Sequence, residues 1–191
     1  MLTTLIELQR LKRLERTGWM LRGLPSGTES VAAHSFGVGV TAMLLADELN
    51  RQGISVNVEK VMRLALLHDW AEVRVGDLPR TASSYFGVDQ RKKAEREAFA
   101  DIVRPVDGPE ALYASLYDDY EERNSLEAKL VKAADVIDLL IQTLALERSG
   151  ARGLDEFWEV TAQPDFQLED PARRVVQDVI QALLNKRSEL G

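Results

Sequence analysis

The stretch L-V-K-A-A-D-V-I-D-L-L-I-Q-T-L-A-L, at residues 130–146, is apolar on nearly every side of a helix. A helix of this kind belongs at the centre of a helical bundle, because each of its faces needs an apolar partner. Helical periodicity also dominates the rest of the chain, and no alternating apolar and polar segment is long enough to predict a strand. The sequence therefore predicts an all-α fold, a single helical-bundle domain over residues 1–191.

The other helices are predicted from apolar spacing, capping residues, glycine and proline. Thr28 or Ser30 can cap one helix, Asn57 can cap the next, and Gly76 can end it. The last helix has an apolar face that can complete the core or bind a partner. We expect two loops, over 18–30 and 81–89. One expected helix runs from the cap at 28 or 30 to about residue 51. The other expected helices cover 2–16, 58–74, 90–103, 111–123, 126–147, 154–160 and 171–188.

Composition narrows the function classes. The net charge of −7 argues against a surface for a nucleic-acid polymer, which needs a basic stripe to neutralise phosphates. The absence of cysteine excludes disulfides, thiolate catalysis and cysteine-ligated zinc. No stretch approaches the roughly 18 uncharged apolar residues of a membrane span, and residues 1–16 lack the apolar core of a signal peptide. We expect a cytoplasmic enzyme or binding protein without a membrane partner.

The chain has only two histidines, and both lie among apolar residues. His68 directly precedes Asp69 within V-M-R-L-A-L-L-H-D-W-A-E-V, at residues 61–73. Burying an imidazole beside a carboxylate is costly unless both are satisfied, and a divalent metal ion satisfies both. His34 and Asp135 lie in two further apolar runs, so helices of a bundle can bring all four side chains together. We hypothesise a metal site of mixed nitrogen and oxygen ligands.

Each candidate ligand also has a purely structural interpretation. His34 can be a hydrogen-bonded core histidine, and the doublet at 68–69 can be an N-cap or a local ion pair. Asp138 lies one turn beyond Asp135 on a similar helix face, and either can pair with a lysine of the same helix. From spacing alone, these alternatives stay open.

His34, the doublet His68-Asp69 and Asp135 resemble the H…HD…D signature of the HD-domain metal-dependent phosphohydrolases, an all-helical superfamily. The surrounding sequence is similar to the 5′-deoxynucleotidase subfamily, from Leu8 to the G-L-D-E-F-W-E segment at 153–159. Three stretches carry this resemblance: E-S-V-A-A-H-S at 29–35, L-L-H-D-W-A-E-V-R-V-G-D-L-P at 66–79 and A-K-L-V-K-A-A-D at 128–135.

The resemblance implies one divalent transition-metal ion. It also implies that the protein is a homodimer. It gives the fourth ligand role to Asp135 and not to Asp138. Two imidazoles and two carboxylates suit Mn²⁺, Co²⁺, Fe²⁺, Ni²⁺ or Zn²⁺, and such an ion lowers the pKa of bound water and neutralises phosphoryl charge. The implied ligands are His34, His68, Asp69 and Asp135.

Two further carboxylates match the catalytic positions of this subfamily. By resemblance Glu72 is a general acid or base, and Asp77 orients water or the leaving group. The alternatives are solvated carboxylates, and for Asp77 a cap on the turn that follows it. Glu95 or Glu97 can approach the site and hold a second ion, although the charged run at 91–99 is typical of a solvated helix face.

Family members carry an arginine and a tryptophan, side by side, upstream of the first histidine. Here Arg16 and Trp19 are separated by two residues, so Arg22 is a rival for binding phosphate, and Arg13 is a more distant one. By resemblance Trp19 lies against the sugar, where its ring can exclude a 2′-hydroxyl; core packing is the alternative. The loop Asp77, Leu78, Pro79 and Arg80 is expected to reach the substrate, with Thr81 as an alternative to Arg80.

The sequence thus predicts a metal-dependent 5′-nucleotidase that releases phosphate from nucleoside 5′-monophosphates, preferentially those of deoxyribose. One alternative is a phosphohydrolase of the same fold acting on a cyclic nucleotide, a nucleoside triphosphate or a non-nucleotide monoester, since fold does not determine substrate. A second alternative is a non-catalytic module that binds metal or nucleotide. The carboxylates of Glu72 and Asp77 argue against the second, because a binder needs no groups that handle protons.

Overall fold

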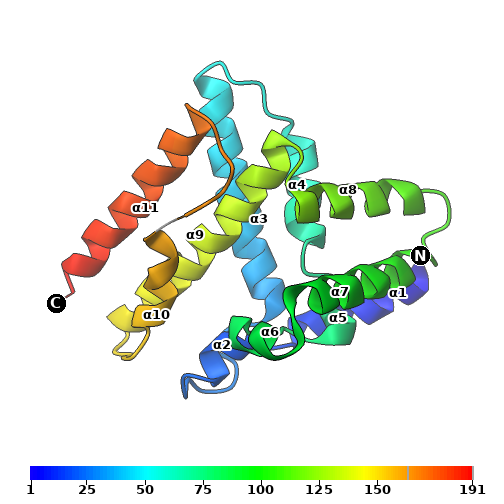
Figure 1. Ribbon diagram of the computed structural model, residues 1–191, viewed down its shortest axis with the longest axis horizontal. Coiled ribbons are helices and arrows are strands. Elements are labelled where there is room, and N and C mark those ends of the chain that lie inside the picture. The colour runs from blue at the N-terminus through cyan, green and yellow to red at the C-terminus, as the bar shows by residue number, and fades with distance from the viewer. Residues whose placement is uncertain (163, 191) are drawn as a thin grey trace. The chain divides into compact units, whose positions relative to one another are not determined.

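Helices form the secondary structure of the computed structural model, which describes residues 1–162 and 164–190 but not the side chains of Arg80, Ser83 and Phe86 (Figure 1). Within these residues no strand occurs, so the all-α prediction is confirmed. In chain order the elements are α1 (Leu2–Leu8), the 3₁₀-helix η1 (Gln9–Lys12), α2 (Thr17–Met20), α3 (Val31–Arg51), α4 (Val58–Leu67), α5 (Glu72–Val75), α6 (Arg80–Phe86), α7 (Val88–Val103), α8 (Glu110–Glu122), α9 (Leu126–Arg148), α10 (Asp155–Trp158), the 3₁₀-helix η2 (Glu159–Thr161) and α11 (Ala172–Ser188).

The described residues group into two compact units, each built from two separate stretches of chain. The first unit comprises residues 1–35 and 66–118, and the second comprises residues 36–65 and 119–190. The single domain expected over residues 1–191 stays a prediction. No described helix combines the length and the apolar character that crossing a bilayer requires.

In the first unit, short elements gather around α7. Helices α1, α5 and α6 contact α7, and α5 also contacts η1. The core includes an aromatic stack in which the ring of Phe99 lies 4.1 Å from that of Tyr117 and 6.1 Å from that of Trp70. On α5, Arg74 forms ion pairs with Glu7 and Asp101, and so ties α5 to α1 and α7.

The second unit is organised around α9, which packs against α10 and α11. Its core holds Leu140, Leu144 and Trp158, against which two leucines of α11 pack. The terminal helix therefore completes the core, which was one of the two roles considered for its apolar face. On α9, the carboxyl of Asp138 lies against Gly37 of α3, so closely that a Cβ added to this glycine would meet Oδ1 at 2.0 Å.

Two predicted loops contain helices, and one predicted helix is interrupted. α2 and α6 each begin one residue before an expected loop, at 17 and 80, and otherwise lie within the expected loops 18–30 and 81–89. The helix expected over 58–74 ends at Leu67, and α5 begins only after a turn. The predicted caps fare better: Ser30 and Asn57 accept backbone N–H groups of α3 and α4 through their side chains, and Gly76, with φ +81°, ends α5.

Candidate metal centre

The candidate site is built on the turn at residues 68–71, directly after α4. There the backbone N–H groups of Trp70 and Glu72 donate to carbonyl oxygens three residues back, as in a 3₁₀ turn. Adjacent side chains of a regular helix point about 100° apart. In this turn, Nε2 of His68 and Oδ2 of Asp69 lie 3.2 Å apart. The interruption of the helix thus brings two consecutive side chains to one point.

His34 comes to the same point from the first turn of α3. That turn is fixed by Ser30, whose hydroxyl accepts the backbone N–H of Ala33 at 3.1 Å. Nε2 of His34 lies 3.8 Å from Oδ2 of Asp69, and the two imidazole rings have centroids 5.6 Å apart. The side chains of His34 and His68 are 0% and 1% exposed. Both rings are therefore shielded from solvent.

Asp69 is ionised at neutral pH. Burial by itself would raise its pKa, but the neighbouring His68, His34 and Arg16 outweigh burial and hold the pKa of Asp69 at about 2. Its Oδ2 is buried and has no hydrogen-bond partner in the described structure. A buried anionic oxygen needs compensation, and here it faces two imidazole nitrogens.

This donor set fits a divalent transition-metal ion. Imidazole nitrogen and carboxylate oxygen together are the ligands that Mn²⁺, Fe²⁺, Co²⁺, Ni²⁺ and Zn²⁺ accept, and a cation would compensate the buried charge of Asp69. The geometry supports the ligand roles predicted for His34, His68 and Asp69. The identity of the ion stays a prediction.

Glu72, the first residue of α5, is uncharged at neutral pH, unlike Asp69. Burial, followed by the charges of Asp69 and Asp77, raises its pKa to about 10, although Arg16 acts in the other direction. Its Oε2 is buried and has no hydrogen-bond partner in the described structure. A protonated carboxyl close to an ionised one is typical of sites where one group donates a proton and the other binds charge.

Arg16 and Asp77 flank this carboxyl pair. Nη1 of Arg16 lies 3.6 Å from Oδ2 of Asp69, which favours Arg16 over Arg22 as the cation of the site. Oδ2 of Asp77 accepts the backbone N–H of Thr17 at 2.5 Å, and its carbonyl oxygen accepts the Thr17 hydroxyl at 2.6 Å. Asp77 therefore caps α2. The predicted cap on the turn that follows Asp77 stays a prediction.

Trp19 is a core residue of the first unit, with 1% of its surface exposed. A ring this deeply buried offers no face to a sugar, so the packing alternative fits better than the predicted sugar contact. Its indole N–H donates to Oε2 of Glu29 at 2.7 Å. Sequence reasoning assigned no role to Glu29 or Thr17, although Glu29 begins the E-S-V-A-A-H-S stretch and Thr17 follows Arg16.

Asp135 and Asp138 belong to α9 of the second unit. Oδ2 of Asp135 accepts a hydrogen bond from Nζ of Lys132 at 2.7 Å and lies 3.5 Å from the hydroxyl of Tyr120. This is the pairing with a lysine that the sequence left open. Its side chain is still 17% exposed, and the ligand role of Asp135 stays a prediction.

The remaining predicted residues are the loop at 78–80 and two glutamates of α7. Leu78 and Pro79 are half-buried, and the side chain of Arg80 lies outside the described residues. Glu95 of α7 has a side chain that is 12% exposed, and its charge adds to the rise in the pKa of Glu72, whereas Glu97 is 71% exposed. The charged run thus has one member close to the site and one on a solvated face.

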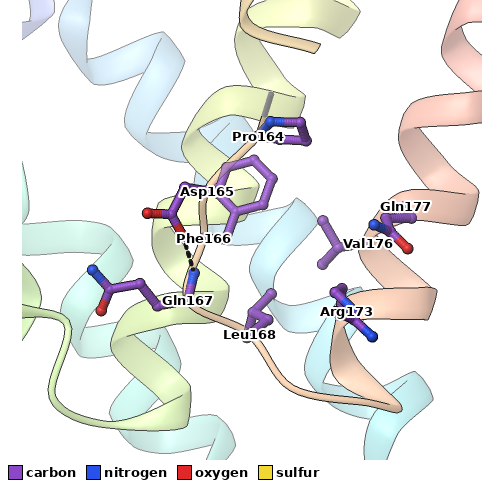
Figure 2. Close-up of a pocket in the computed structure, with 8 residues that line it drawn as sticks. All are labelled: Pro164, Asp165, Phe166, Gln167, Leu168, Arg173, Val176 and Gln177. Carbon is purple, nitrogen blue, oxygen red and sulfur yellow. Dashed lines mark hydrogen bonds between the residues drawn. The ribbon is translucent and has the colours of Figure 1, made fainter. Parts of the chain in front are cut away.

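A hollow lies in the second unit, beside α11 and apart from the predicted site residues (Figure 2). It measures about 400 Å³, and in Figure 2 the backbone N–H of Gln167 bonds the carboxylate of Asp165, at 3.1 Å. None of its lining residues is a predicted site residue. They are Pro164, Asp165, Phe166, Gln167, Leu168, Arg173, Val176 and Gln177.

The chain belongs to the HD domain family, whose model matches residues 8–165. Among its curated relatives is the 5′-deoxynucleotidase HDDC2 of Danio rerio, 36% identical over 155 residues that make up 80% of this chain and 73% of the relative. The 5′-deoxynucleotidase hdd1 of Schizosaccharomyces pombe is 32% identical over 157 residues, which cover 78% of this chain and 75% of that one.

A solved structure with the same fold is a conserved hypothetical protein from Pyrococcus furiosus. It has 33% sequence identity and a TM-score of 0.80, over 97% of this chain and 99% of that chain. The family and the all-α fold agree with the resemblance seen in the sequence, and the candidate metal centre contains three of the four ligands that this resemblance implies, His34, His68 and Asp69. Their ligand roles stay predictions.

Proposed function

We propose that this protein is a metal-dependent 5′-nucleotidase that hydrolyses deoxyribonucleoside 5′-monophosphates to nucleoside and phosphate. The names of its relatives support this activity. The observation that carries the proposal is the convergence of His34, His68 and an ionised Asp69, with a protonated Glu72 and a guanidinium beside them.

The proposed metal ligands are His34, His68, Asp69 and Asp135, the last of them by the family resemblance. When bound, a divalent ion supplies an activated water and neutralises charge on the phosphoryl group. Mn²⁺ and Co²⁺ are the first ions to test. The homodimer and the cytoplasmic location expected from the sequence are further predictions.

The chain's own side chains have divided tasks. Arg16 binds the phosphate, since its guanidinium already lies 3.6 Å from Asp69. Glu72, whose pKa is raised to about 10, donates its proton to the leaving 5′-oxygen, and this raised pKa supports the acid role over the base role. Asp77 orients the leaving group. Its carboxylate also accepts the backbone N–H of Thr17, and so holds the residue that follows Arg16. Leu78, Pro79 and Arg80 form the substrate side of the loop.

The experiment is a phosphate-release assay on the purified protein with Mn²⁺ or Co²⁺. The substrates are the deoxyribonucleoside 5′-monophosphates, the matching ribonucleotides, a cyclic nucleotide and a nucleoside triphosphate. We expect release from the deoxyribonucleotides, and a loss of about 10²-fold in Glu72→Gln. Glu97→Gln is the matched control: the Glu97 carboxylate is 71% exposed, and the variant should retain activity.

Two results would overturn the proposal. Pyrophosphate or triphosphate as the product, or turnover of the cyclic substrate alone, would mean a different phosphohydrolase. Nucleotide binding without any turnover, together with equal behaviour of Glu72→Gln and the parent, would mean a binding module.

A further inference from the structure

Arg16 lies in a short segment that is paired with the start of α3. The backbone N–H of Arg16 donates to the carbonyl oxygen of Glu29 at 3.0 Å, and that of Val31 donates to Leu14 at 2.8 Å. These two bonds enclose an isolated antiparallel bridge at residues 15 and 30. The backbone of Arg16 is thereby held directly before α2 and beside the helix that carries His34.

The side chain of Glu29 holds the other end of α2. Its Oε2 accepts the indole N–H of Trp19 at 2.7 Å, and Trp19 is 1% exposed. A buried donor left without an acceptor costs about 1–3 kcal/mol. Removing the Glu29 carboxylate would therefore remove the acceptor of this bond and weaken the attachment of Trp19.

Arg16 is thus fixed on both sides. Glu29 holds its backbone and, through Trp19, the body of α2, while Asp77 holds Thr17, the residue that follows Arg16. A long arginine side chain loses about 2 kcal/mol of rotamer entropy when it is fixed on a ligand. A backbone that is already in place reduces what the ligand must order.

Resting on the proposed function, we propose that Glu29 is a positioning residue for the phosphate. It does not touch the substrate; it acts by holding Trp19 and α2, so that the guanidinium of Arg16 stays at the metal centre. Sequence alone shows Arg16 and Trp19 separated by two residues, and the Glu29 carboxylate joins Trp19, in this longer segment, to the residues just before α3.

The role depends on an acceptor and not on charge. Glutamine at position 29 keeps an acceptor oxygen at nearly the same place, whereas alanine removes it. Phenylalanine at position 19 removes the donor but keeps an aromatic ring in the core. These three changes separate loss of the hydrogen bond from loss of packing.

The test is steady-state kinetics on a deoxyribonucleoside 5′-monophosphate for Glu29→Ala, Glu29→Gln, Trp19→Phe and the double variant Glu29→Ala/Trp19→Phe. We expect Glu29→Ala to raise KM about tenfold with a much smaller change in kcat, because binding of the phosphate is what weakens. Glu29→Gln should stay within about threefold of the parent. In the Trp19→Phe background, Glu29→Ala should add little, because the bond is already absent.

A spectroscopic reading accompanies the kinetics. The indole N–H resonance of Trp19 should move in Glu29→Ala and stay near its place in Glu29→Gln. Glu15→Ala is the matched control: Glu15 belongs to the same paired segment, but its carboxylate accepts only from the exposed Ser26 among the bonds seen in the structure, so kinetics and resonance should both stay unchanged.

Failure of the inference can be told from failure of the proposed function. If the parent releases phosphate but Glu29→Ala keeps the parental KM while its indole resonance moves, the positioning role is wrong and the function stands. Full additivity in the double variant would overturn the positioning role as well.

If Glu29→Ala does not fold, the test uses Glu29→Gln and Glu29→Asp instead. A KM raised by the shorter Asp side chain and not by Gln supports the proposal, and an equal KM in both variants overturns it. If the parent protein releases no phosphate, the proposed function itself is wrong.

Discussion

The two compact units are built in contrasting ways. The second unit depends on long regular helices, with the 23-residue α9 at its centre and an apolar core of Leu140, Leu144 and Trp158. The first unit assembles its candidate site from short pieces of chain: a four-residue turn, the four-residue helix α5, Arg16 just before the four-residue helix α2, and the first turn of α3, which carries His34. A regular helix spaces its side chains evenly, which suits packing, whereas a turn can direct consecutive side chains to one point, which suits chemistry.

The largest expected effect follows from removing a ligand in the turn. Asp69→Ala should lower phosphate release about 10³-fold, equivalent to about 4 kcal/mol of transition-state stabilisation, and should also lower the metal content of the protein. Asp47→Ala, on the exposed side of α3, is the control and should change neither. Phosphate release assays and elemental analysis give both readings. Parental metal content in Asp69→Ala would contradict the ligand role.

Glu72 should make the metal-free protein less stable as the pH rises. The pKa of Glu72 is raised from 4.5 to about 10 in the folded state, so between these values the folded state holds a proton that the unfolded state has lost. Stability is then fully present below about pH 4.5 and declines toward pH 10 by about 1.4 kcal/mol per pH unit. Glu72→Gln removes this slope.

The measurement for Glu72 is urea unfolding in the presence of a chelator at several pH values. At pH 7 the Gln variant should be more stable than the parent by about 3 kcal/mol, and the gap should widen at pH 8. Parallel stability curves for the two proteins would show that Glu72 is ionised in the folded state.

In the second unit, the close contact between α3 and α9 can be tested with two glycines of one helix. Gly37→Ala places a methyl group against the carboxyl of Asp138 and should cost about 1–3 kcal/mol. Gly39→Ala meets only Met62, at an ordinary 3.7 Å, and should be neutral or stabilise by up to about 1 kcal/mol. Chemical denaturation compares them. Equal stabilities would mean that Asp138 moves aside at no cost.

The smallest effect is expected for the ion pairs that tie α5 to its neighbours. Arg74→Gln breaks the pairs with Glu7 and Asp101, and because Arg74 is 35% exposed the loss should be about 0.5–1 kcal/mol. Arg51→Gln breaks a pair whose arginine is 72% exposed and should be close to neutral. Thermal unfolding can rank the two. A larger loss in Arg51→Gln would contradict this dependence on exposure.

The long helices could be predicted from sequence because their determinants are local. Ser30 and Asn57 cap the helices that follow them, and the apolar run of α9 predicts its central place. α2 could not be predicted in this way, because its cap is supplied by Asp77, 60 residues away. The polar segment that forms α6 also lacks apolar periodicity, so it was expected to be a loop.

The candidate site shows the same division. The His-Asp doublet, Glu72 and Arg16 could be predicted from residue types and resemblance, and the structure places them together in the first unit. Sequence left open whether Trp19 packs in the core or contacts the sugar, because its partner Glu29 comes from a segment that local spacing does not connect to it. Nor does an apolar sequence pattern reveal that the chain turns at residue 68.

The break between α4 and α5 has a consequence for local dynamics. The N–H groups of Trp70, Glu72, Val73 and Arg74 donate to carbonyls three residues back, so these bonds can open without melting the regular ladder of α4. Opening would separate His68 from Asp69, and a shared cation would oppose it. Deuterium uptake over residues 68–75 should therefore report on occupancy of the metal centre even when no substrate is present.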